Sequence, residues 1–215
     1  MKKLIIAIVL MAGSAWATDF RDSLQVYTDD GRIYGASSYT SGNTYTCLGN
    51  DGETNSSWYL FRGVTIPASA TISAAHISFK ADGNGSVTTC KVIIYGNDTA
   101  SAIYPGSFAA YGLKVTTTAS VSWTITAWTS GTFYDSPDLS TVVQEIVNRV
   151  DWTSGNAMMF LVKDDGSTAN AIRNPSGWDG ADATRGPYLE VTYTTGAVTT
   201  TTIIRAAIVR GGVVR

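Results

Sequence analysis

The stretch Ser136-Pro-Asp-Leu-Ser-Thr-Val-Val-Gln-Glu-Ile-Val-Asn-Arg-Val-Asp-Trp-Thr-Ser-Gly-Asn-Ala-Met-Met-Phe-Leu-Val162 decides the fold of this chain. It opens as a helix, because Ser136 can cap the first turn, Pro137 fits the first helical position and Asp138 lies near the positive end of the helix dipole. Its apolar residues then recur at helical spacing on one face: Leu139, Val142, Val143, Ile146, Val147 and Val150. We expect this stripe to pack on a protein core. A Trp-x-Ser-Gly-Asn turn and an apolar strand follow directly.

The remainder of the chain has the pattern of an all-β protein. Gly, Ser, Thr, Asn and Asp recur every eight to twelve residues, with alternating apolar segments between them. This spacing predicts a β-sandwich, and we expect the short amphipathic helix to plug one of its open ends. The expected strands are Ser23–Thr28, Ser57–Val64, Ala70–Ala81, Thr89–Gly96, Val121–Thr126, Ala157–Lys163 and Tyr188–Thr194.

The strand Ala70–Ala81 has two distinct faces, because successive side chains in a strand point to opposite sides. One face carries Ile72, Ala74, His76 and Ser78. The other face, which we expect to be the core face, carries Ala75, Ile77 and Phe79.

Residues 1–17 are interpreted as a bacterial-type export signal. Lys2 and Lys3 precede an apolar run, Leu4–Ala12, and Ala15-Trp16-Ala17 matches an A-x-A cleavage site. The alternative, an N-terminal membrane anchor, is disfavoured because the run is short for a bilayer span. We therefore expect a mature protein that begins at Thr18, has no transmembrane segment, and is secreted or lies at the cell surface.

Three further regions follow the signal. Residues 18–194 form the expected β-sandwich domain, and residues 195–202 are a Thr-rich linker. Residues 203–215 are a tail in which two aliphatic residues, an Arg and two small residues repeat. This tail, Ile203–Arg215, could be a disordered or fraying end, a β-forming segment that adds to a sheet edge in cis or on a neighbouring subunit, or an attachment to an acidic surface.

Charge disfavours nucleic acid as a partner. Of 15 Lys and Arg residues, two lie in the signal and three in the tail, so the body has 10 against all 17 acidic residues, a net charge of −7. Binding to phosphates requires a basic surface.

The chain has two cysteines, Cys47 and Cys90. In an exported protein an even number favours a disulfide. This bridge would close a loop of about 43 residues and stabilise the fold by about 4 kcal/mol. The alternative is two buried thiols on neighbouring strands.

The body resembles a family of secreted bacterial jelly-roll modules, namely the domains named after a DNRLRE motif and the related alginate-binding carbohydrate-binding modules. The similar segments, in the family's order, are Leu60–Val64, Ile66–Phe79, Trp123 and Trp128, the helix Asp138–Asn148, Trp152–Ala157 and Gly186–Tyr193. The resemblance implies a jelly-roll β-sandwich that binds or displays a ligand. It transfers no sugar-contacting residue, since the similar positions belong to the scaffold and the DNRLRE string itself is absent.

No convincing catalytic arrangement is present, and we expect that the protein is not an enzyme. The single histidine, His76, falls in an expected strand, and no Gly-x-Ser-x-Gly motif occurs. Carboxylate pairs could support glycosidic chemistry. However, Asp164 with Asp165, and Asp179 with Asp182, lie in Gly-rich turns where Asp is expected for backbone reasons.

A structural Ca²⁺ is the only cofactor that we consider, because Ca²⁺ requires clustered oxygen ligands. The best local cluster, Trp178–Asp182, offers Asp179 and Asp182. The pairs Asp164–Asp165 and Asp29–Asp30 rank behind it, and none of the three has EF-hand spacing.

Sugar binding would use aromatic rings that stack on pyranose faces, together with polar side chains that read hydroxyl groups. Trp178 is the best exposed candidate because it lies in a polar loop between Arg173 and Arg185. Tyr104, Tyr111 and Tyr134 are weaker candidates in other loops. The alternative is that these rings only cover the ends of loops.

Two functions of different classes remain. The first is a secreted, non-catalytic carbohydrate-binding or surface-adhesive module whose partner is a polysaccharide or cell-surface glycan. The second is a structural subunit of an extracellular assembly, such as a filament, envelope layer or virion appendage, that associates with itself through Ile203–Arg215. A glycan lyase or hydrolase is a third interpretation that lacks suitable residues.

Overall fold

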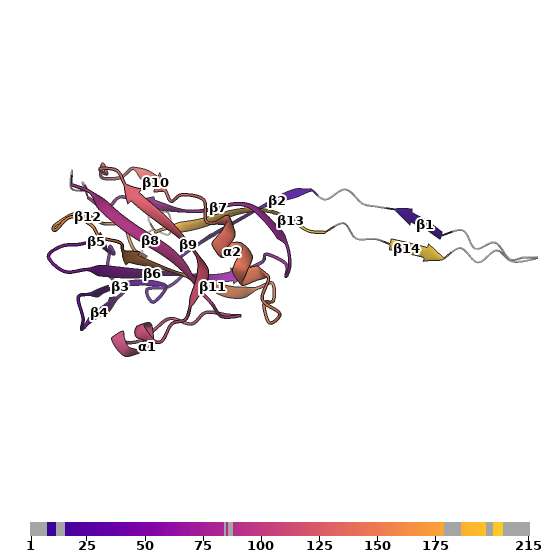
Figure 1. The fold of residues 1–215 in the computed structure, drawn as a ribbon, viewed down its shortest axis with the longest axis horizontal. Helices are drawn as coiled ribbons and strands as arrows, with labels where there is room; N and C mark the ends of the chain where they lie inside the picture. Colours follow the sequence, from indigo (N-terminus) through magenta and orange to yellow (C-terminus); the bar gives the residue numbers. More distant parts are fainter. Residues whose placement is uncertain are drawn as a thin grey trace, which may run out of the picture.

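The computed structural model describes residues 8–11, 16–83, 85, 88–178, 186–196 and 200–203. Strands dominate these residues (Figure 1). The strands are β1 Ile8–Met11, β2 Ala17–Ser23, β3 Asp30–Tyr34, β4 Ser38–Ser41, β5 Leu48–Gly49, β6 Asn55–Val64, β7 Thr71–Lys80, β8 Cys90–Asn97, β9 Thr116–Ile125, β10 Phe133–Asp135, β11 Asn156–Asp164, β12 Ile172–Arg173, β13 Tyr188–Thr194 and β14 Thr200–Ile203. The two helices in the described residues are α1 Phe108–Gly112 and α2 Ser140–Val147.

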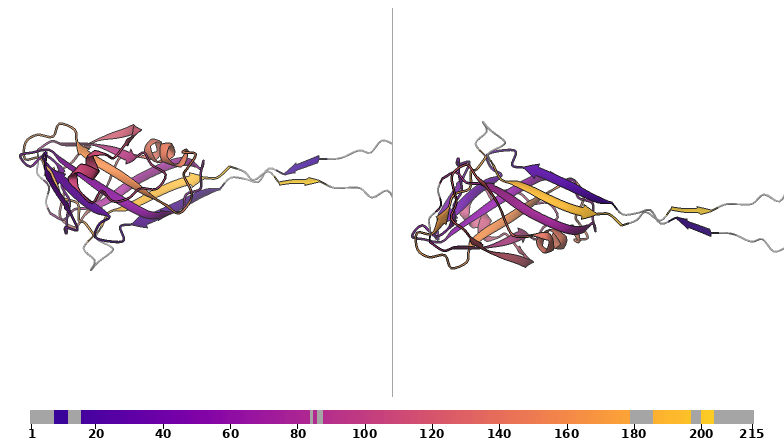
Figure 2. Two further views of the ribbon diagram at one scale, coloured as in Figure 1. Left: turned by 90° about the horizontal axis from the view of Figure 1, so that it is seen from below. Right: turned by 90° about the horizontal axis from the view of Figure 1, so that it is seen from above.

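Two antiparallel sheets form a sandwich, as Figure 2 shows from two sides. One sheet has four strands in the order β10-β7-β13-β2, and the other has six in the order β4-β3-β6-β11-β8-β9. The strands of a sandwich alternate between core-facing and outward-facing side chains. Phe79 of the four-stranded sheet therefore meets Tyr59 of the six-stranded sheet in the core, with 5.1 Å between ring centroids. The all-β sandwich predicted from the sequence is confirmed.

Helix α2 closes one end of the sandwich, also as predicted. It packs against β7 of the four-stranded sheet and against β8 and β9 of the six-stranded sheet. Its approach to β8 is close, since a Cβ at Gly96 would lie 2.7 Å from Ile146 Cδ1 and would displace that side chain. The stripe Leu139, Val142, Val143, Ile146 and Val147 is buried, whereas Val150 lies beyond the helix and is exposed.

The predicted start of this helix is wrong. The helix begins at Ser140 after Leu139, which makes no side-chain cap. Ser136 Oγ instead accepts a hydrogen bond from Ile77 N, and Asp138 Oδ1 accepts one from Ala75 N. Both side chains therefore extend the edge of β7, a tertiary use that local cap preferences do not reveal.

The core face of β7 is confirmed by the burial of Ala75, Ile77 and Phe79. The assignment of Ile72 to the opposite face is wrong, because Ile72 is buried. The ladder with β13 shifts between Thr192↔Ala74 and Tyr193↔Ile72. This bulge inserts one residue and reverses the alternation for the start of the strand.

The first predicted strand, Ser23–Thr28, is also misplaced. β2 ends at Ser23, and the chain then turns. Asp29 explains the turn, because its Oδ2 accepts hydrogen bonds from Gln25 N at 2.9 Å and Val26 N at 3.0 Å. These local bonds compete with continuation of the strand.

The outer face of the six-stranded sheet is covered. A second apolar cluster on this face contains Trp58, Leu60, Met159 and Leu161 of the central strands. Residues 98–115 lie over it and contribute Ala102 and Tyr111, the latter from the unpredicted helix α1. The apolar run in β11 is thus buried on both faces, which explains its lack of alternation.

Strands β1 and β14 form a separate antiparallel ribbon, with register from Ile8↔Ile203 to Met11↔Thr200. The ribbon lies beyond the β2–β13 ladder, which ends at the pair Ala17↔Thr194 (Figure 1). The predicted linker therefore contains part of a strand. Residues 204–215 of the tail lie outside the described residues.

The predicted disulfide is wrong. Cys47 and Cys90 are both buried free thiols. Their Sγ atoms lie 3.9 Å and 3.8 Å from the same acceptor, Leu48 O. Burial raises the pKa of Cys47 to about 12 and also raises the pKa of Cys90. The alternative of two buried thiols is the observed one.

Among the helices of the described residues, none is both long and apolar enough to span a bilayer.

Candidate binding face on the four-stranded sheet

The structure separates the residues predicted to bind sugar. Arg173 is 1% exposed, and its guanidinium donates hydrogen bonds to four carbonyl oxygens, those of Thr88, Ile125, Thr126 and Ile172. Arg173 is therefore a structural residue that fastens β12 to neighbouring loops, and its prediction as a glycan contact is wrong. Trp178 is half-buried against the core, and Arg185 lies outside the described residues.

Tyr134 belongs to an aromatic cluster between the two sheets. Its ring stacks on Trp128 with 5.1 Å between centroids and 8° between planes. Its hydroxyl accepts a hydrogen bond from Thr129 N at 2.9 Å. Trp123 and Phe79 continue the cluster. Tyr134 therefore packs, while its neighbours on either side along β10, Phe133 and Asp135, point to the opposite face.

The predicted metal ligands do not form a cluster among the described residues. Asp164 Oδ1 accepts a hydrogen bond from Ser167 N within its own turn, whereas Asp165 Oδ2 lies 3.5 Å from Ser122 Oγ of β9. No group of three or more His, Cys, Asp or Glu side chains suited to a metal occurs in the described part of the chain. Asp179 and Asp182 lie outside it.

A different site lies on the outer face of the four-stranded sheet, which we call the open face. The register places its outward side chains in rows across β10, β7, β13 and β2. The rows are Phe133 with Lys80, then Asp135, Ser78, Tyr188 and Ser23, then His76, Glu190 and Arg21, and finally Ala74, Thr192 and Asp19.

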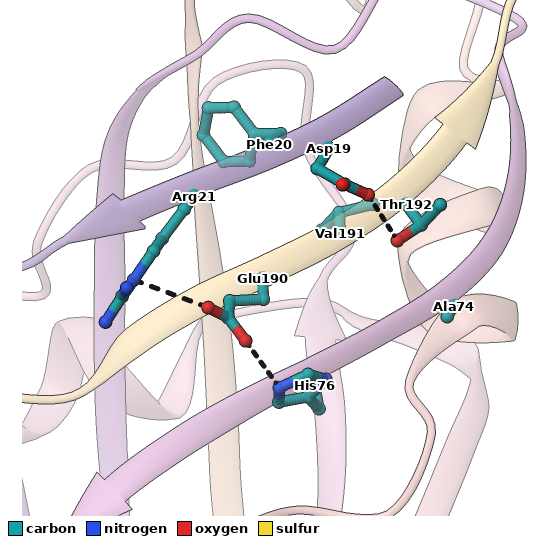
Figure 3. Close-up of a pocket in the computed structure, with 8 residues that line it drawn as sticks. All are labelled: Asp19, Phe20, Arg21, Ala74, His76, Glu190, Val191 and Thr192. Carbon is teal, nitrogen blue, oxygen red and sulfur yellow. Dashed lines mark hydrogen bonds and ion pairs between the residues drawn. The ribbon is translucent and has the colours of Figure 1, made fainter. Parts of the chain in front are cut away.

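Glu190 is the centre of a polar network on this face (Figure 3). Its Oε1 lies 3.4 Å from Arg21 Nε, and its Oε2 lies 2.8 Å from His76 Nε2. His76 Nε2 also lies 3.9 Å from Asp135 Oδ2. One carboxylate thus spans three strands and holds a cation on one side and an imidazole on the other.

Two aromatic rings flank this network. Phe133 and Tyr188 lie 5.5 Å apart between centroids with 50° between planes. The Arg21 guanidinium lies 3.8 Å from the Tyr188 centroid, and Lys80 Nζ lies 5.6 Å from that of Phe133. Cations at such distances are attracted to ring faces. The rings are therefore held in place without being buried.

A shallow hollow of about 320 Å³ lies beside the network. Its lining includes Asp19, Arg21, Ala74, His76 and Thr192. Asp19 Oδ1 accepts a hydrogen bond from Thr192 Oγ1 at 2.8 Å. The small Ala74 side chain, next to the bulge in β7, is part of this lining and is labelled in Figure 3.

The open face combines what a polar ligand needs. It offers ring surfaces for stacking, carboxylates that accept hydrogen bonds, and Arg21, Lys80 and His76 as donors. The network is supported by regular strands, so its side chains are positioned before any ligand arrives.

Sequence reasoning missed this face for an identifiable reason. Alternation had assigned Ala74, His76 and Ser78 to one side of a strand, which is confirmed. However, it could not show that β10 and β2 continue this surface from distant parts of the chain. The alternating outward residues of β13, Tyr188, Glu190 and Thr192, were the available signal.

Comparison with protein-family models and with curated protein sequences finds no match to this chain. The jelly-roll family resemblance therefore stays a prediction from the quoted segments.

Proposed function

We propose that this protein is a secreted, non-catalytic carbohydrate-binding module whose glycan lies on the open face of the four-stranded sheet. The observation that carries the proposal is the pairing of the exposed Phe133 ring and the half-buried Tyr188 ring with the Glu190 network on one face of the sheet. Export through residues 1–17 belongs to this proposal, which also agrees with the family resemblance.

Each part of the face has a role in this mechanism. A pyranose ring presents C–H groups that stack on Phe133 or Tyr188, and its hydroxyls bind polar side chains nearby. Glu190 and Asp135 accept hydrogen bonds, while Arg21 and His76 donate them. Because Glu190 already orients Arg21 and His76, little side-chain freedom is lost on binding.

The charge of the face favours a neutral glycan over an acidic one. Arg21 and Lys80 are opposed by Asp19, Asp135 and Glu190, and Arg21 already pairs with Glu190. A polyanionic chain would meet at least as much negative as positive charge, which costs affinity. We therefore expect neutral polysaccharides to be retained more strongly than alginate or other polyuronates.

Retention in affinity electrophoresis through gels containing neutral polysaccharides tests this assignment. The double variant Phe133→Ala, Tyr188→Ala should lose about 5- to 150-fold in affinity, since stacking contributes on the order of 0.5–1.5 kcal/mol per ring. The matched control is Tyr104→Ala, because Tyr104 is 40% exposed, as is Phe133, but lies in the segment 98–115 on the far sheet. Loss of retention in the control alone would move the site to that segment and contradict the proposal.

Strand β14 favours a second candidate function, a structural subunit. In the structure β14 pairs with β1, which lies inside the proposed export signal. Removal of that signal would leave Thr200–Ile203 without its partner, and an unpaired strand can pair with another chain.

Size-exclusion chromatography with light scattering on residues 18–215 and 18–194 tests this second candidate. Multimers that become monomers on truncation would support assembly through the C-terminal segment. Monomers in both cases would eliminate it.

A further inference from the structure

We propose that Asp30 and the main-chain carbonyl of Asn43 form part of a buried site for a divalent cation with oxygen ligands, of which Ca²⁺ is the best match. The site is separate from the open face and does not depend on the proposed glycan binding. It lies where the turn after β2, the segment after β4 and the segment before Trp178 meet.

One carboxylate oxygen of Asp30 is buried and has no hydrogen-bond partner among the described residues. Asp30 is 0% exposed, and its Oδ2 has no hydrogen-bond partner in the structure. Its Oδ1 accepts a single long hydrogen bond, from Trp178 N at 3.4 Å. Nearly all buried polar groups in native proteins are paired. An unpaired anionic oxygen at this depth therefore indicates a missing ligand.

A second acceptor oxygen, Asn43 O, lies beside the same position as Asp30 Oδ2. A Cβ built on Gly177 would lie 2.4 Å from Asp30 Oδ2 and 2.5 Å from Asn43 O. Both oxygens therefore lie close to the Cα of Gly177. Both are hydrogen-bond acceptors while Asp30 is ionised, so they cannot form a hydrogen bond with each other. Two converging acceptors, one a carboxylate and one a main-chain carbonyl, are the ligand types that Ca²⁺ takes.

Negative charge is in excess around the turn after β2. Asp22, Asp29 and Asp30 lie close together around the turn after β2, and the nearby cation is Arg62. Arg62 Nε is 2.6 Å from Asp29 Oδ1, so Arg62 already forms an ion pair with Asp29. Asp22 Oδ2 is also buried without a partner. A divalent cation would offset this excess of negative charge, which a bridging water would not.

Such an ion would connect segments that the sequence keeps far apart. Gly177 N donates to Thr44 O at 2.8 Å, and Thr46 N donates to Pro175 O at 2.9 Å, so these segments are already adjacent. An ion at Asp30 and Asn43 would add the turn after β2 to the same junction. Ca²⁺ then acts as a structural ion that closes the end of the sandwich away from α2.

Calcium binding to the full chain at pH 8 is the direct test, measured by equilibrium dialysis with ⁴⁵Ca²⁺ after treatment with EDTA. We expect about one ion per chain. At a hundredfold excess over Kd, we also expect Tm to rise by about 5–10 °C. Absence of bound calcium, with Tm unchanged, would overturn the proposal and indicate that a proton or a water lies between the two oxygens.

Asp30→Asn and Asp165→Asn form the matched pair of variants. Asp30→Asn keeps the shape of the side chain but removes the anionic ligand, so bound calcium and the Tm shift should both disappear. Asp165 lies in an exposed turn, and Asp165→Asn should leave both unchanged. Equal calcium binding by Asp30→Asn and the wild type would place the ion elsewhere and overturn the proposal.

The wild-type chain remains decisive where Asp30→Asn does not fold. Equilibrium dialysis of the wild-type chain needs no variant, so a wild-type chain that binds no calcium overturns the proposal whether or not Asp30→Asn folds.

Discussion

The two outer faces of the sandwich differ in what covers them. The outer face of the six-stranded sheet carries Trp58, Leu60 and Leu161 in an apolar cluster that residues 98–115, which include helix α1, help to form. The outer face of the four-stranded sheet carries alternating polar side chains, and no segment of the described residues is seen to cover it in this way. The chain thus uses the segment of about 18 residues, 98–115, to bury the outer face of the six-stranded sheet.

This difference is informative about function. A covered face needs only shape and apolarity, whereas an uncovered face must stay polar to avoid aggregation. Exposed rings on an uncovered face therefore require an explanation that buried rings do not. Phe133 is such a ring, packed beside the half-buried Tyr188, and glycan binding is the explanation that we propose.

The largest expected effect concerns the covered face. Trp58 is fully buried and stacks on Tyr39 with 5.1 Å between centroids. Trp58→Ala should lower the free energy of unfolding by about 3–5 kcal/mol, because it leaves a large cavity. Urea denaturation followed by circular dichroism measures this loss. A loss below about 1 kcal/mol would show that residues 98–115 cover this face only loosely.

Two arginines sharpen the comparison between buried and exposed positions. Arg173→Met should cost about 2–4 kcal/mol, since several buried carbonyl oxygens lose their donor. Arg21→Met should cost less than about 0.5 kcal/mol, because the Arg21–Glu190 pair is largely exposed. The same urea titration measures both variants. Similar losses would mean that the open face contributes to stability as much as the interior does.

The buried carboxyl group of Asp30 extends the comparison of buried and exposed positions to the dependence of stability on pH. Burial raises the folded-state pKa of Asp30 from 3.8 to about 7, so folding disfavours its ionised form. Stability should therefore fall as pH rises from about 4 through 7. In EDTA we expect Tm to fall by several degrees between pH 5 and pH 8, and Asp30→Asn to flatten this dependence in differential scanning calorimetry. A profile unchanged by Asp30→Asn would assign the dependence to other groups.

The smallest effect on stability is expected at the centre of the open face. Glu190→Gln keeps the size of the side chain and removes its charge from the contacts with Arg21 and His76. We expect thermal denaturation to change by less than about 2 °C, since exposed ion pairs contribute little. Glycan affinity should nevertheless fall by about tenfold in the gel assay. Unchanged affinity would restrict the binding site to the two rings.

Local sequence signals predicted the elements that are locally determined. The stripe of α2 and the alternation in β7 and β13 identified the helix, the core face and the sandwich. The errors arise where distant segments intervene. Ser136 and Asp138 both accept hydrogen bonds from β7, although Asp138 also accepts two from Ser140 at the start of α2, and the bulge beside Ala74 depends on the pairing with β13.

The candidate site was less predictable than the fold, for a related reason. A polar loop favoured Trp178 as the exposed ring, and other expected loops made Tyr104, Tyr111 and Tyr134 weaker candidates. Burial depends instead on which strands meet, and Tyr134 packs on Trp128 while Phe133, one residue earlier, is exposed. The network that joins Arg21, His76 and Glu190 spans three strands from both ends of the domain and has no local signature.

The pairing of Ala17 with Thr194 has a mechanical consequence. The chain enters and leaves the sandwich at neighbouring positions on antiparallel strands, so tension between these two points would open the β2–β13 ladder one register pair at a time, as in a zipper. Tension between the C-terminal end and a ligand held on the open face would instead load β13, which is hydrogen-bonded to β7 as well as to β2. The sandwich should therefore resist pulling through its ligand better than pulling through its two ends.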